Sequence, residues 1–139
     1  MREILFRGKS EYGDKWISGS LHSEYGETDK DGNRKIDYRI LGMHGECTYI
    51  IPETVGQFTG LTDKNGKKIF DGDIIEGHCH SRWRHDVQRC EIAYYRDGFE
   101  ARHHVKCGEE EHYYSYKVLF SKDVVVIGNI HDNPELLEV

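Results

Sequence analysis

Two tight-turn signals stand close together in the middle of the chain, and they limit what this chain can fold into. The segment Asp63-Lys64-Asn65-Gly66-Lys67 contains Asn-Gly, a dipeptide that tolerates the positive φ angles of a tight β-hairpin. Asp71-Gly72-Asp73 follows almost at once and is also typical of a turn. Because a long helix cannot run through such a segment, the sequence predicts short antiparallel strands here.

The composition extends this prediction to the rest of the chain. There are 15 glycines and two prolines in 139 residues, and nine of the aromatic residues are tyrosines. Glycine is favoured in tight turns and tyrosine in strands. We therefore expect an all-β protein, with a small N-terminal sheet over residues 1–48 and a C-terminal, barrel-like (SH3-like) β unit over residues 49–139.

Several elements of this fold can be placed in the sequence. Two short helical turns are expected, at residues 52–56 and 133–137, because Pro52 and Pro134 suit the first position of a helix and Asn133 suits an N-cap. The apolar run at 124–127 is expected to be a central strand, and the charge run at 109–111 a solvated loop. The residues expected to be buried are Trp16, Ile17, Leu21, Ile50, Val55, Phe58, Ile69, Ile74, Ile92, Val125 and Ile127.

Charge and apolar runs exclude several classes of partner. The net charge of −6 argues against a protein that grips nucleic acid with its whole surface, which needs a surplus of Lys and Arg. No apolar run approaches the length that spans a membrane, so we expect no membrane partner and a cytoplasmic protein. In that reducing compartment the four cysteines are expected to be free thiols.

Two segments imitate the start of an EF-hand calcium loop. They are Asp29-Lys30-Asp31-Gly32-Asn33 and Asp63-Lys64-Asn65-Gly66. In the first, the sixth and twelfth positions require Gly and a bidentate Glu but hold Arg34 and Ile40. The second segment fails at the same two positions, which hold Lys68 and Ile74. We therefore interpret both segments as hairpin tips.

Nine His and Cys residues in the second half of the chain could hold zinc, which prefers imidazole and thiolate ligands. His78 and His80 would share one face of a strand, and His104-x-x-Cys107 could supply a second pair. The absence of a Cys-x-x-Cys knuckle weakens this hypothesis. The residues are His78, Cys79, His80, His85, Cys90, His103, His104, Cys107 and His112. A zinc-dependent protein using residues 78–112 is therefore the weaker alternative.

A second alternative is a nucleic-acid-binding accessory protein. Arg82-Trp83-Arg84 combines positive charge with a large aromatic ring, which could stack on a base and hold phosphates. A loop whose tryptophan packs back onto the sheet explains the same residues and agrees better with the net charge. No nucleophile elbow, phosphate-binding loop or convincing carboxylate pair is present. The sequence thus predicts no enzyme, and no catalytic, cofactor-binding or metal residue.

Three segments of the chain together form a recognisable sequence pattern. The first is Phe6-Arg7-Gly8-Lys9 followed by Trp16-Ile17-Ser18-Gly19. The second runs from Ile51 to Leu61 and continues through the turns at 63–67 and 71–74. The third is Val126-Ile127-Gly128-Asn129-Ile130 with Asp132-Asn133-Pro134-Glu135-Leu136. Together these segments resemble the YopX family of proteins, which are encoded by phages and prophages in bacterial host cells. The match leaves out residues 77–121, so nothing about the His/Cys residues is inherited.

The resemblance implies small β units, a phage or prophage origin and self-association, and it brings no established activity. We expect a non-enzymatic accessory protein that acts as a homo-oligomeric binding or interaction module, with a further protein partner also open. Tyrosines on the strands of the second half would suit such a surface, because tyrosine is enriched at protein interfaces. They are Tyr94, Tyr95, Tyr113, Tyr114 and Tyr116.

Overall fold

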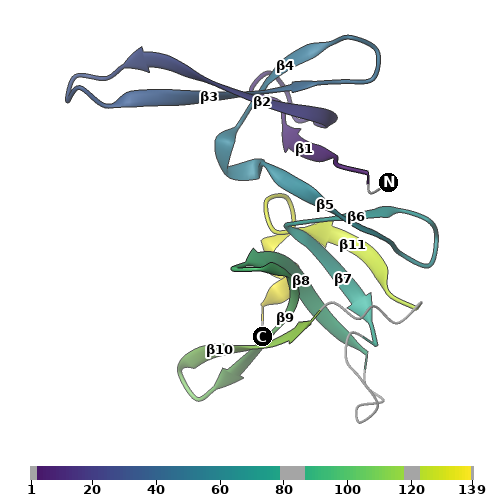
Figure 1. Cartoon of the computed structure of the whole chain (residues 1–139). Coiled ribbons are helices and arrows are strands. Elements are labelled where there is room, and N and C mark those ends of the chain that lie inside the picture. The colour runs from purple at the N-terminus through teal and green to yellow at the C-terminus, as the bar shows by residue number, and fades with distance from the viewer. Residues whose placement is uncertain (1–2, 79–86, 118–122, 139) are drawn as a thin grey trace. The chain divides into compact units, whose positions relative to one another are not determined.

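The chain is built almost entirely of antiparallel β-strands, as the computed structural model shows for residues 3–78, 87–117 and 123–138 (Figure 1). It divides into two compact units, residues 1–58 and 59–139. The all-β class expected from the sequence is confirmed. The expected subdomain boundary after residue 48 stays a prediction, because compactness alone does not show that either part folds by itself.

Eleven strands are described, and they form two sheets. The first sheet has the order β4-β3-β2-β1-β5-β6, with β1 (Phe6–Lys9), β2 (Trp16–Thr28), β3 (Arg34–Leu41), β4 (Cys47–Ile50), β5 (Gly56–Thr62) and β6 (Lys68–Phe70). The second has the order β10-β9-β8-β7-β11, with β7 (Asp73–Gly77), β8 (Gln88–Tyr95), β9 (Gly98–Cys107), β10 (Glu110–Lys117) and β11 (Val125–Asn129). Two 3-10 turns, η1 (Pro52–Thr54) and η2 (Pro134–Leu137), are the helical elements of the described part, and neither could cross a membrane.

In the first unit the sheet curls so that the end of β1 reaches β4. Ser10, just after β1, forms an antiparallel bridge with Ile50, and the amide of Glu11 donates to the carbonyl of Tyr49 at 3.0 Å. This approach requires glycine at position 8, because a Cβ there would lie 2.1 Å from Cγ2 of Ile50. The Phe6-Arg7-Gly8-Lys9 segment is thus a packing motif.

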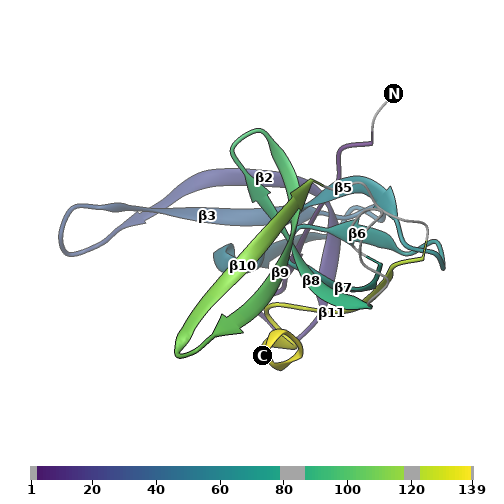
Figure 2. The same ribbon diagram turned by 90° about the horizontal axis from the view of Figure 1, so that it is seen from below.

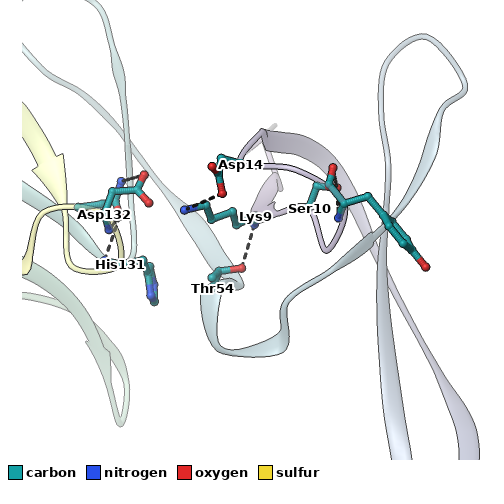
Figure 3. A network of polar contacts seen from close by, with 8 residues as sticks. Lys9, Ser10, Asp14, Thr54, His131 and Asp132 are labelled. Atoms are coloured by element: carbon teal, nitrogen blue, oxygen red, sulfur yellow. Dashed lines mark hydrogen bonds and ion pairs between the residues drawn. The ribbon is translucent and has the colours of Figure 1, made fainter.

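The turn η1 is tied to β1 by its threonine (Figure 3). The amide of Lys9 donates to Oγ1 of Thr54 at 2.8 Å, and that hydroxyl donates to the carbonyl of Ile51 at 2.6 Å. Nζ of Lys9 lies 3.9 Å from the carboxylate of Asp14. Pro52 opens the turn, as predicted, and needs no amide partner there. Hydrogen bonds from β1 therefore hold this single helical turn in place.

Both calcium-loop imitations are hairpin tips, as interpreted from the sequence, and they have the same geometry. In one, the carboxylate Oδ1 of Asp29 accepts from the amides of Asp31 and Asn33 at 2.9 and 2.8 Å. In the other, Oδ1 of Asp63 accepts from the amides of Asn65 and Lys67, both at 2.9 Å. The glycine of each tip, 32 or 66, has a φ of +82°. Glycine adopts this left-handed backbone conformation at little cost in free energy, which explains why glycine stands three positions after the aspartate in both tips.

The second unit has its core on one face of the five-stranded sheet. Ile75, Cys90, Ile92 and Ala101 are almost completely buried there, together with Ile69 from β6 and Val124 before β11. Rows of partners cross the strands in register, for example Ile75 with Cys90 and Ile92 with Ala101. The alternation of buried and half-buried residues along β8 follows from this single packed face.

Strand β11 is not central, and this expectation was wrong. It lies at the end of the sheet order, next to β7 alone. Its free side is instead met by the tip of the β5–β6 hairpin, where the amide of Val126 donates to Oδ2 of Asp63 at 3.0 Å and the amide of Lys64 donates to the carbonyl of Val124 at 3.1 Å. An apolar strand can thus be an edge strand when a turn covers it.

The chain after β11 turns on Asn129. Its Oδ1 accepts from the amides of His131 and Asp132 at 3.0 and 2.9 Å, and Figure 3 shows these two residues. The predicted second helical turn follows as η2, with Pro134 at its start. The side chain of Asn133 makes no cap bond, however, because its Oδ1 accepts from the amide of Asn129 at 3.3 Å.

The predicted core is confirmed in part. Ile50, Phe58, Ile69, Ile74 and Ile92 are buried as expected. The other six are only half-buried, namely Trp16, Ile17, Leu21, Val55, Val125 and Ile127. Buried residues that the sequence analysis did not name include Ile40, Phe70, Ile75, Cys90, Ala101 and Val124. Strand pairing among the described residues leaves both sheets open, so the SH3-like barrel is not established.

Candidate interaction surface

The candidate surface of this protein lies on β8, β9 and β10, where aromatic and charged side chains gather. Tyr94, Tyr95, Tyr113 and Tyr114 are each about half exposed, at 54, 48, 50 and 52%. This confirms the expected exposure of four of the five tyrosines, and the side chain of Tyr116 lies outside the described part. Neighbours in a strand face opposite ways, so the four tyrosines occupy both faces of the sheet.

The outer face of these strands carries a cluster around Arg102, which we call the Arg102 cluster. Nε of Arg102 lies 2.6 Å from Oε1 of Glu100, and its guanidinium carbon stands 4.8 Å from the ring centre of Tyr113 and 5.7 Å from that of Tyr95. Beside it, Nε2 of His104 is 2.8 Å from Oε1 of Glu91. Residues 91, 95, 100, 102, 104 and 113 share this face because they are paired or spaced by two.

The cluster fixes the charge state of its arginine. Burial lowers the pKa of Arg102, but the hydrogen bond and charge of Glu100, with further help from Tyr113 and Glu91, outweigh burial and raise that pKa above its ordinary value. The guanidinium is therefore a permanent cation held between two phenol rings and a carboxylate. Tyrosine and arginine are enriched among the residues that contribute most to binding at protein interfaces.

Strands β9 and β10 form a two-stranded ribbon that continues past β8 (Figure 2). β9 pairs with β8 only as far as Arg102, opposite Glu91, whereas it pairs with β10 along the whole register to Cys107, opposite Glu110. The expected solvated loop at 109–111 was wrong in part, because Glu110 and Glu111 belong to β10. All described side chains of β10, residues 110–115, are exposed.

A cavity of about 280 Å³ opens where β8 and β9 diverge. Its lining includes Glu76, Arg89, His103 and His104. These groups are engaged within the unit: Nε of Arg89 lies 2.7 Å from Glu76, and Nδ1 of His103 is 3.2 Å from the carbonyl oxygen of Arg89. The histidine side chain thus contacts the backbone of β8 where the ladder between the strands has ended.

The residues of the zinc hypothesis do not converge where the structure describes them. In the described ranges, no group of three His, Cys, Asp or Glu side chains could hold a metal ion. His104 and Cys107, the expected pair, are three residues apart on β9 and so face opposite ways. His104 is paired with Glu91 and His112 with Glu110, at 2.8 and 3.3 Å.

The remaining candidate residues lie partly within and partly outside the described ranges. His78 contacts the carboxylate of Asp123, whereas Cys79, His80 and His85 lie outside the described residues. Cys47 and Cys107 are exposed free thiols, as expected, and Cys90 is a core residue. Arg82-Trp83-Arg84 also lies outside the described residues, so the nucleic-acid hypothesis for this segment stays a prediction.

The sequence analysis missed the Arg102 cluster, although it named both of its tyrosines. Arg102, Glu100 and Glu91 gave no motif, since their meeting depends on the register of three strands. The signal that could have found them is alternation: Glu100, Arg102 and His104 stand two apart on β9, with Phe99, Ala101 and His103 between them.

Comparison with known proteins agrees with this fold. No curated protein matches the sequence. Among solved structures, protein EF1440 from Enterococcus faecalis is similar, at 26% sequence identity and a TM-score of 0.53 over 99% of this chain and 100% of that one. The family model described as YopX protein matches residues 5–138, nearly the whole length, and the chain therefore belongs to the YopX family.

Proposed function

We propose that this protein is a non-enzymatic interaction module that works as a homo-oligomer, and that its copies join through the open edge of β10. A phage or prophage origin, a role as an accessory protein and a place in the cytoplasm of the bacterial host are parts of the same proposal. They are supported by the family resemblance, whereas the route of self-association is supported by the geometry of β10.

The observation that carries the proposal is a long, exposed edge strand. β10 has eight residues and stands at the end of the five-stranded sheet, with β9 as its neighbour. Its Tyr113 and Tyr114 are about half exposed on opposite faces. An edge of this length offers a row of amides and carbonyls to a further strand, and proteins normally shorten, charge or cover such edges.

The other sheet ends are shortened or covered. β6 has only three residues. β4 is met by the chain after β1, where Glu11 donates to Tyr49, and β11 is met by the turn that contains Asp63. Against these three ends, the length and exposure of β10 favour it as the surface for a second strand.

The SH3-like description of the second unit belongs to the same proposal. The bonds from Val126 to Asp63 and from Lys64 to Val124 bring the β5–β6 hairpin onto β11, and the amide of Gly72 donates to the carbonyl of Ile92 at 2.7 Å. These contacts support a small barrel-like unit in which β10 is the end that stays open.

The hairpin between β9 and β10 indicates which backbone groups face outward. A two-residue loop, Gly108-Glu109, closes on the pair Cys107 and Glu110, and such a pair exchanges hydrogen bonds. Bonding then alternates along the ladder, so Glu110, His112 and Tyr114 bond inward to β9. The odd-numbered residues, Glu111, Tyr113, Ser115 and Lys117, consequently direct their amides and carbonyls outward.

The experiment is sedimentation equilibrium of the wild type, Ser115→Pro and Ser115→Ala. Proline at position 115 removes an outward amide and leaves the inward ladder, and edge strands tolerate proline in that orientation. We expect the wild type to be an oligomer and Ser115→Ala to associate equally well. The dissociation constant of Ser115→Pro should rise by up to about tenfold, because symmetry removes the same hydrogen bond twice.

Circular dichroism and thermal unfolding of Ser115→Pro check that its fold is intact. If that variant folds and still associates like the wild type, the copies join elsewhere and β10 is not the surface. If the wild type is a monomer at every concentration, the homo-oligomeric function itself is wrong.

A further inference from the structure

We infer that two copies pair antiparallel along β10 about a two-fold axis at Tyr114, which joins two five-stranded sheets into one continuous sheet. This register rests on the proposed function and specifies its partner as a second copy of this chain. It places Tyr114 opposite Tyr114 of the second copy, and Tyr113 opposite Ser115 of the second copy.

The backbone groups of β10 limit which residues can stand opposite each other. In an antiparallel pair, two directly opposite residues either bond to each other or both point away. Glu110 bonds inward to Cys107, and the alternation from there directs the odd-numbered residues 111, 113, 115 and 117 outward. Two copies of this edge can therefore pair only odd-numbered residues with odd-numbered ones.

Two-fold symmetry then selects the centre of the pair. The axis places one residue opposite its own copy, and residues at equal distances on either side of it stand opposite each other. An axis at Tyr113 or at Ser115 matches three of the outward residues and leaves the fourth beyond the end of the opposite strand. An axis nearer to either end of β10 matches two or fewer.

An axis at Tyr114 matches all four outward residues, because 111 then stands opposite 117 and 113 opposite 115. Each outward residue exchanges two backbone hydrogen bonds with the residue opposite, which gives about eight bonds in all. The axes at Tyr113 and Ser115 give about six. The Tyr114 register therefore satisfies more of the open edge than any other symmetric register.

The residues that meet in this register also favour it. Glu111 and Lys117 stand opposite each other and have opposite charges, whereas an axis at Glu111 would oppose two carboxylates. Tyr114 is about half exposed and would meet its own copy at a non-bonded position, where side chains approach most closely. Aromatic pairs directly opposite each other stabilise antiparallel strands.

The register also makes the Arg102 cluster continuous with the junction. Residues that stand opposite each other share a face of the sheet, and Ser115 stands opposite Arg102 of β9. Tyr113 of the second copy, opposite Ser115, therefore lies on the same face and in the same cross-strand row as Arg102. Because serine is small, it leaves room over this row for the phenol ring. The two Arg102 clusters thus lie on one side of the joined sheet.

Disulfide trapping with single cysteines tests this register. In the background, every cysteine except the buried Cys90 is changed to serine. Tyr114→Cys would bring its two copies to a Cα–Cα distance of about 4.5 Å, within the range of about 4.4–6.8 Å that a disulfide spans. Tyr113→Cys is the matched control, because its two copies would be diagonal neighbours about 7–8 Å apart. We expect mild oxidation to cross-link Tyr114→Cys at least about tenfold faster.

A mixture of Tyr113→Cys and Ser115→Cys is the second measurement, and it leaves Tyr114 in place. These two positions stand opposite each other across the junction at about 5.5 Å between Cα atoms, whereas each is diagonal to its own copy. We therefore expect the two variants to cross-link to each other faster than either cross-links to itself. This result decides the register even if Tyr114→Cys associates weakly.

The outcomes separate this inference from the proposed function. A wild type that associates, with a Tyr113→Cys variant that cross-links to itself as fast as Tyr114→Cys or faster, keeps the β10 surface and overturns the Tyr114 register. Association without cross-linking in either measurement also overturns the register, and Ser115→Pro then decides whether β10 is the surface. A wild type that is monomeric at every concentration overturns both.

Discussion

At the scale of single residues, Asp63 and Asp29 are the same turn residue in different surroundings. Each holds two amides of its own hairpin tip on one carboxylate oxygen. Asp63 is 6% exposed and uses its second oxygen to accept from Val126, 63 positions away, whereas Asp29 is exposed. Asp29 is therefore a natural control for the hydrogen bond between Val126 and Asp63.

We predict that Asp63→Asn destabilises the second unit by about 1–3 kcal/mol, because the amide nitrogen cannot accept from Val126 and leaves a buried donor unsatisfied. Asp29→Asn should stay within about 0.5 kcal/mol of the wild type, since an asparagine oxygen still serves an exposed turn. Urea unfolding of both variants measures this difference. Equal effects would mean that the bond to β11 contributes nothing.

The same carboxylate predicts a dependence on pH. Burial raises the pKa of Asp63, but its hydrogen bonds from Val126, Lys67 and Asn65 and the charge of Lys67 outweigh burial and lower that pKa below its ordinary value. A lowered pKa stabilises the fold above the unfolded value of about 3.9, and this stabilisation is lost as the pH falls through the lower, folded pKa.

Unfolding measured from pH 7 down to pH 3 should therefore show a smaller loss of stability in Asp63→Asn than in the wild type. The asparagine cannot titrate, so its share of the acid-induced loss is absent. Parallel curves for the two proteins would contradict a special role for the Asp63 carboxylate.

At the scale of elements, turn chemistry made much of this fold predictable. Asn65-Gly66 and Asp31-Gly32 place two hairpins correctly because a left-handed glycine is a local requirement that neighbours cannot replace. Pro52 and Pro134 likewise begin the two 3-10 turns. Local signals of this kind do not depend on which strands pair.

Features that depend on which strands pair were harder to predict from the sequence. β2 runs through polar residues to Thr28 because it pairs with β3, and Glu24 meets Arg39 of β3 at 2.7 Å in an ion pair that no local pattern predicts. Trp16 is half-buried since the guanidinium of Arg7 lies 4.7 Å over its ring. The Arg102 cluster was missed for the same reason, because three strands must be in register before its members meet.

At the scale of the whole molecule, two compact β units form one chain whose family is established, and the proposed function concerns how copies of that chain join. The account requires β10 to gain a neighbour when copies associate. Outward amides of β10, including those of Glu111, Tyr113 and Ser115, must then become bonded, whereas those of Glu110, His112 and Tyr114 already bond to β9.

The most direct measurement is hydrogen exchange of the individual β10 amides at low and high protein concentration. We predict that the amides of Glu111, Tyr113 and Ser115 exchange up to about tenfold more slowly at high concentration, because exchange then requires the strands of the two copies to separate. The inward amides should keep their rates. Outward amides that exchange equally fast at every concentration would contradict association through β10.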